Sequence, residues 1–96
     1  MKKRHSYQVM VTEVAEPGGL GPSSEIVFTH HNHDDLARIV ALVRASSGLD
    51  ADSSAALAVG LKLLGQVVLE HKTEPPFVAL LSPLREFIAA LKARRG

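Results

Sequence analysis

Two segments near the N-terminus alternate between apolar and polar residues, which is typical of half-buried β-strands. The first spans residues 7–15 and the second residues 23–31. Between them, residues 17–22 are Pro-Gly-Gly-Leu-Gly-Pro, which predicts a loop. Two strands with a short glycine-rich connection are expected to pair as an antiparallel hairpin. The apolar positions on the shared faces are Tyr7, Val9, Val11, Ile26 and Phe28.

The period of the apolar positions then changes to that of a helix. Asn32 is expected to be the N-cap of this helix, with Asp35 three residues later completing a capping box. Asp34 is expected to pair with Arg38 one turn later. Gly48 is expected to end the helix. The apolar stripe consists of Leu36, Ile39, Val40 and Val43.

A second helix is predicted from Asp50 or Asp52, either of which can cap it, to about residue 71. Most of its positions are Ala, Val, Leu or Gly, so we expect it to be buried on most sides, as the central helix of the fold. Its polar residues form one narrow stripe, made of Lys62, Gln66 and Glu70.

If this helix is the central helix of the fold, its glycines and its leucines should both be packed against other parts of the chain. Gly60 and Gly65 each cost roughly 1 kcal/mol in a helix interior, so close backbone contacts are expected to offset that loss. Leu61 and Leu64 are expected to be buried, and truncating either one to alanine is expected to cost roughly 2–5 kcal/mol.

The last part of the chain predicts a third helix. Pro75 and Pro76 end the second helix, and residues 77–81 are expected to form a short helical turn. Ser82 followed by Pro83 is typical of an N-cap with proline at the first helical position. The apolar face that follows contains Leu84, Phe87, Ile88 and Leu91.

This order of elements predicts an α+β fold, β-β-α-α-α, with a single layer of helices against the hairpin. Residues 1–96 are expected to form a single domain, with residues 1–5 and 93–96 as flexible tails. A lone two-stranded hairpin is marginal in water, and its edges expose unpaired backbone groups. We therefore expect a homodimer in which strand pairs with strand.

Composition narrows the class of protein. Hydrophobic residues make up 46% of the chain, so a folded core is expected. The absence of cysteine excludes disulfides and thiolate chemistry, and it fits the reducing environment of the cytoplasm. The longest apolar stretch, Ala55 to Leu69, is interrupted by Lys62 and Gln66, so no membrane span is expected.

Charge is distributed unevenly. Six of the eleven basic residues lie at the two ends, which leaves five basic and all ten acidic residues between them, a net charge of −5. An acidic body is a poor surface for nucleic acid, although weak binding through the basic ends stays an alternative. The terminal basic residues are Lys2, Lys3, Arg4, Lys92, Arg94 and Arg95.

The densest polar cluster is the segment His30–Asp35. Imidazole and carboxylate groups bind divalent metals, so His31, His33 and Asp35 are candidate ligands. The alternative is a strand-to-helix junction, in which the carboxylates favour the positive helix end. No other cofactor is expected, because Gly18–Gly21 joins two strands and precedes neither a lysine nor a helix N-terminus that could bind phosphate.

Of the functions considered, catalysis has the least support from the sequence. Every serine is explained by a strand, turn or cap position, and none lies in a nucleophile-elbow pattern. Asp50 and Asp52 lie at a helix start, which lowers the pKa of a carboxyl group and so disfavours a general acid.

Several segments resemble the bacterial family known as domain of unknown function 3861. They are Asn32–Leu36, Gly48–Asp52 and Ala55–Gly65, with Ser23–Glu25 and Glu70–Lys72 in addition. The resemblance implies a compact α+β domain of the bacterial cytoplasm and carries no established activity. The surplus of apolar faces for a chain of this size favours a small interaction or accessory module.

Overall fold

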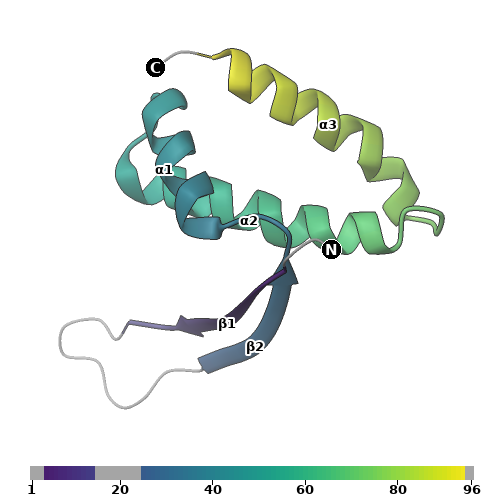
Figure 1. The fold of residues 1–96 in the computed structure, drawn as a ribbon, viewed down its shortest axis with the longest axis horizontal. Helices are drawn as coiled ribbons and strands as arrows, with labels where there is room; N and C mark the ends of the chain where they lie inside the picture. Colours follow the sequence, from purple (N-terminus) through teal and green to yellow (C-terminus); the bar gives the residue numbers. More distant parts are fainter. Residues whose placement is uncertain (1–3, 15–24, 95–96) are drawn as a thin grey trace. The chain divides into compact units, whose positions relative to one another are not determined.

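The computed structural model describes residues 4–14 and 25–94. It confirms the α+β class, with an antiparallel hairpin followed by three helices (Figure 1). The chain divides into two compact units, the hairpin unit Met1–His33 and the helical unit Asp34–Gly96, and the single domain stays a prediction. The elements are β1 (His5–Thr12), β2 (Glu25–Asn32), α1 (Leu36–Ser46), α2 (Ala51–Glu70) and α3 (Phe77–Ala93).

The hairpin has the predicted pairing. Its register runs from His5 opposite Asn32 to Thr12 opposite Glu25, so β1 begins inside the segment expected to be a tail. The predicted loop 17–22 lies outside the described residues. Because side chains alternate along a strand, the exposed apolar residues of the hairpin divide between its two faces. They are Met10, Val11, Ile26, Val27 and Phe28.

The start of α1 differs from the prediction. Its N-cap is Asp35, whose Oδ1 accepts hydrogen bonds from the backbone N–H groups of Ala37 (3.1 Å) and Arg38 (3.4 Å). Asn32, the predicted cap, is instead the last residue of β2, and its amide lies 3.2 Å from His30 Nε2. The hydrogen-bonded pairing of β2 extends through Asn32, so the turn into the helix comes three residues later.

The corner between α1 and α2 is held by short-range hydrogen bonds. Gly48 ends α1 with φ 78°, a left-handed conformation that glycine adopts without strain. Asp50 caps α2 as predicted, accepting a 2.7 Å hydrogen bond from Ser53 N–H. The hydroxyls of Ser47 and Ser54 are fully buried and lie 2.9 Å apart. Together these contacts fix the angle at which α2 leaves α1.

The burial of α2 differs from the prediction. Gln66, predicted on the polar stripe, is only 9% exposed, whereas Leu64, predicted to be buried, is 45% exposed. The expectation for Gly60 and Gly65 is also wrong, since a Cβ added at either position meets no atom within 4 Å. The reason is that α1 and α3 pack against limited sides of α2, and the rest of this apolar helix faces solvent.

By length and composition, α2 could cross a membrane, a test that the core helix of a soluble protein also passes. The helix has 20 residues and is predominantly apolar. The limited burial of α2 therefore leaves an apolar surface that a partner or an apolar phase can cover.

The third helix is longer than predicted. It begins at Phe77 and continues through Pro83, so the expected break at Ser82 is wrong. Backbone hydrogen bonds from Val78 to Glu74 and from Ala79 to Pro76 hold its first turn. Proline at position 83 removes the N–H that would bond the Ala79 carbonyl, and its ring crowds that carbonyl. Ala79 is exposed, so water can satisfy its carbonyl oxygen. None of the side chains of α3 is buried.

Candidate functional site

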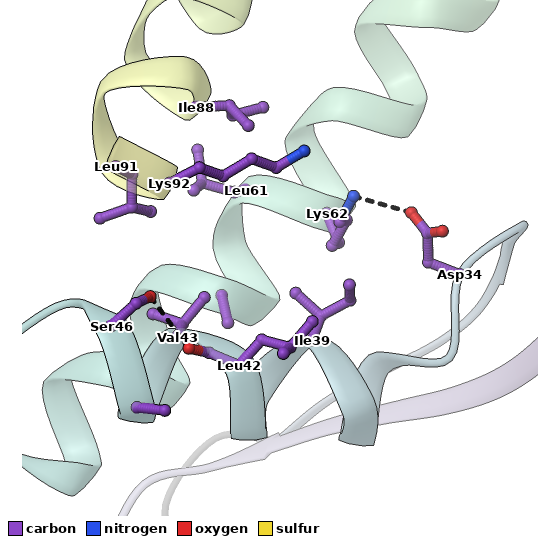
Figure 2. Close-up of a pocket in the computed structure, with 12 residues that line it drawn as sticks. Asp34, Ile39, Leu42, Val43, Ser46, Leu61, Lys62, Ile88, Leu91 and Lys92 are labelled. Carbon is purple, nitrogen blue, oxygen red and sulfur yellow. Dashed lines mark hydrogen bonds and ion pairs between the residues drawn. The ribbon is translucent and has the colours of Figure 1, made fainter. Parts of the chain in front are cut away.

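The three helices enclose a groove that is the candidate functional site (Figure 2). Its volume is about 670 Å³, within the range of small-molecule sites in proteins. α2 packs against both α1 and α3, and each of the three helices contributes lining residues. The residues that line it are Asp34, Ile39, Leu42, Val43, Ala45, Ser46, Ala58, Leu61, Lys62, Ile88, Leu91 and Lys92.

Helical spacing explains why the walls of the groove are apolar. Ile39, Leu42 and Val43 lie three and four residues apart on α1, so they share one side of that helix. Ile88 and Leu91 do the same on α3. The sequence predicted four of these five residues on the apolar stripes of their helices. The structure leaves them lining an open groove.

Leu42 is the wall residue that sequence analysis missed. It is 54% exposed and lies one position beyond the predicted stripe of α1. Its carbonyl oxygen accepts a 2.9 Å hydrogen bond from Ser46 Oγ, which also lines the groove. That serine therefore satisfies its hydroxyl within α1, and the groove wall on this side stays apolar.

Charged side chains gather at one end of the groove. Lys62 Nζ lies 2.7 Å from Asp34 Oδ2, so the predicted pairing of Asp34 with Arg38 is wrong. Figure 2 shows Lys92 extending from α3 across the groove toward the end at which Lys62 and Asp34 lie. Lys92 makes no ion pair with any residue in the ranges 4–14 and 25–94.

The signal for this charged end is present in the sequence. Lys62 follows Ala58 by four residues, and Lys92 follows Ile88 by four residues. Helical spacing therefore places each lysine on the same side as an apolar wall residue. In the sequence, Lys92 instead counted as one of the basic residues at the C-terminal end, next to the tail expected at residues 93–96. Of that tail, residues 95 and 96 lie outside the described residues.

The predicted metal ligands are placed as follows. His31 is exposed on β2, and its Nδ1 lies 2.9 Å from Ser6 Oγ. His33 is exposed after the end of β2, and Asp35 uses its carboxylate to cap α1. Within the described parts of the chain, no group of three or more His, Cys, Asp or Glu side chains could hold a metal ion. The metal site stays a prediction from the sequence.

One electrostatic effect stands out among the carboxylates. Hydrogen bonds from the backbone and the side chain of Ser53 lower the pKa of Asp50 from its ordinary value of 3.8. The carboxylate is therefore held as an anion at the start of α2, as its capping role requires. This environment agrees with the expectation that Asp50 is not a general acid.

The chain and its fold are similar to known proteins. The chain is similar to a structure of a protein of unknown function from Pectobacterium atrosepticum, with 29% sequence identity and a TM-score of 0.81. That similarity covers 96% of this chain and 100% of the other. No functionally curated protein matches. A family described as a domain of unknown function with a solved structure matches residues 5–93. Since the match spans both the hairpin and the three helices, the chain belongs to the DUF3861 family.

Proposed function

We propose that the protein is a small cytoplasmic interaction module whose working form is a homodimer. The observation that carries this proposal is the outer face of α2, which we define as Ala56, Gly60, Leu64 and Val67. These residues are spaced by four, four and three positions, so they lie along one side of the helix. All four are exposed, with Leu64 at 45% and Val67 at 41%.

The charged residues of α2 do not lie on its outer face, as charged residues would on the exposed side of an ordinary surface helix. Its charged residues are Asp52, Lys62 and Glu70, and none of them belongs to the outer face. Lys62 lines the groove instead, and Gln66 is buried. A surface helix normally directs its polar side to water. An exposed helix side without charge is typical of a surface that another protein covers.

A second copy of the chain is the occupant that this face suits. In a two-fold dimer the same patch meets itself, so any charge in the patch would face a like charge. The outer face of α2 has no charge and avoids that repulsion. Gly60 at its centre leaves open space, so the backbones of two α2 helices can approach closely.

An estimate of the free energy of association indicates that the hairpin also contributes to the dimer interface. Full burial of a leucine or valine is worth about 1.5–3 kcal/mol, so covering the exposed half of Leu64 and Val67 in both copies gives roughly 4 kcal/mol. Association costs about 4–15 kcal/mol, so the outer face of α2 is insufficient alone. The five exposed apolar residues of the hairpin supply the additional area. Edge-to-edge pairing of strands, as expected from the sequence, is one way to bury them.

Sedimentation equilibrium from 1 to 200 micromolar tests the proposal. We expect a dimer for the wild type and a monomer for Leu64→Glu, because the substitution places two carboxylates against each other. Leu42→Glu is the matched control, since Leu42 is similarly exposed but lies in the groove. A wild-type monomer at every concentration would overturn the homodimer. Dissociation by Leu42→Glu but not by Leu64→Glu would overturn the assigned face.

The strand pairing has its own test. Proline at Val9 and proline at Val27 each remove one N–H from the hairpin. We expect only the substitution whose N–H faces the partner strand to dissociate the dimer, with circular dichroism confirming that the fold persists. If both variants remain fully dimeric, the hairpin edges do not form the interface.

A further inference from the structure

We propose that the groove between α1, α2 and α3 binds a long-chain carboxylate, an acyl chain that ends in one carboxylate group. The acyl chain lies along the apolar walls, and the carboxylate binds at the end where Lys62 and Lys92 lie. This site is separate from the outer face of α2, so the inference does not depend on the homodimer.

The walls of the groove determine the apolar part of the ligand. Eight of the twelve lining residues are Leu, Ile, Val or Ala: Ile39, Leu42, Val43, Ala45, Ala58, Leu61, Ile88 and Leu91. Water in contact with such a surface is unfavourable, and an acyl chain would replace it. A ligand in the groove would touch α1, α2 and α3 at once. It would therefore cover Ile88 and Leu91 of α3, which the chain itself leaves only half-buried.

The charged end determines the head group. Lys62 and Asp34 form an ion pair whose charges cancel, while Lys92 adds one positive charge that no described residue balances. A monoanion restores neutrality there. Most lining residues lie within helices, where backbone N–H groups already bond to carbonyls. The amide cluster that commonly binds phosphate is therefore missing from the lining, and the one unbalanced positive charge suits a monoanionic carboxylate.

Isothermal titration calorimetry with octanoate, decanoate and dodecanoate, below their micelle concentrations, tests the site. Each buried CH₂ group is expected to tighten binding about 4-fold, so dodecanoate should bind about 15-fold more tightly than decanoate. Methyl dodecanoate has the same chain without the charge and should bind at least 10-fold more weakly. Equal affinity for the acid and the ester would overturn the assignment of the head group.

Three variants locate the carboxylate. Lys92→Met retains an unbranched side chain that can contact the groove but removes the charge. It is expected to weaken dodecanoate binding about 10-fold. Lys72→Met is the matched control, because Lys72 is an exposed lysine outside the groove, and it should leave affinity unchanged. Asp34→Asn frees Lys62 from its ion pair and should tighten binding several-fold. If Lys72→Met weakens binding as much as Lys92→Met, the effect is non-specific and the site is wrong.

Two further measurements distinguish acyl-chain binding in the groove from dimerisation and from binding to a membrane surface. Leu64→Glu should bind dodecanoate like the wild type, even if it dissociates the dimer, so the groove and the homodimer can fail independently. Flotation with phosphatidylglycerol vesicles tests a membrane surface. Binding to these vesicles without saturable binding of monomeric dodecanoate up to 1 millimolar would overturn the proposal.

Discussion

Replacing Ser54 with alanine is expected to open a closed ring of hydrogen bonds at the corner between α1 and α2. Leu49 N–H donates to Ser47 Oγ at 3.1 Å, and Ser54 Oγ donates to the Leu49 carbonyl oxygen at 3.3 Å. The Ser54 hydroxyl proton is thereby used, so the 2.9 Å contact between the two hydroxyls has Ser47 as donor. Each hydroxyl donates once and accepts once, and both are fully buried.

The expected cost follows from the groups left without partners. Ser54→Ala deprives the Ser47 hydroxyl of its acceptor and the Leu49 carbonyl of a donor. An unsatisfied buried polar group costs about 1–3 kcal/mol. The higher helix propensity of alanine offsets about a few tenths of a kcal/mol of that cost. We therefore expect a loss of about 2 kcal/mol. Ser47→Ala leaves the Leu49 N–H without this acceptor, and we expect a loss of about 1–2 kcal/mol.

Urea denaturation at one fixed protein concentration measures these losses. With a slope near 2 kcal/mol per molar, Ser54→Ala should lower the midpoint by about 1 M. The double variant should lose less than the sum of the two single losses, because both act on one ring. Ser82→Ala, on the exposed surface of α3, should change stability by less than about 0.5 kcal/mol. The ring would be refuted if Ser54→Ala and Ser47→Ala each lost no more stability than Ser82→Ala. It would also be refuted if the loss of the double variant equalled the sum of the two single losses.

Three further predictions concern the helix ends and the interior of α2. Asp35→Ala should lower stability by about 1 kcal/mol in urea melts, whereas Asp35→Asn should retain most of it, because asparagine also caps helices; equal losses would contradict the cap. The lowered pKa of Asp50 means that its contribution to stability is present above pH 3.8 and is lost as pH falls through its folded-state pKa. Asp50→Ala should therefore lose less stability than the wild type between pH 5 and pH 2, and parallel losses would contradict this role. Gly65→Ala should raise the thermal midpoint, because a Cβ meets no atom within 4 Å and alanine favours a helix by about 1 kcal/mol; a lower midpoint would indicate a contact that the chain alone does not show.

The sequence predicted the elements of this fold because short-range physics sets them. Alternation of apolar residues marks β1 and β2, and helical spacing marks the three helices. Gly48 and Asp50 act where they were expected, since a left-handed turn and an N-cap depend on residues within one turn. Asp35 took the cap expected of Asn32 because β2 continues to Asn32. Pairing with β1, a long-range event, decided that boundary.

Only the tertiary structure decided which side of each element faces water. Periodicity shows that Leu64 and Leu61 are apolar, but it does not show which neighbour covers them. α1 and α3 pack on other sides of α2, so Leu64 is exposed while Leu61 lines the groove. The groove itself unites residues from positions 34 to 92. Its existence depends on how far apart α1 and α3 lie on α2, a distance that no local pattern encodes, because it results from packing among side chains distant in the sequence.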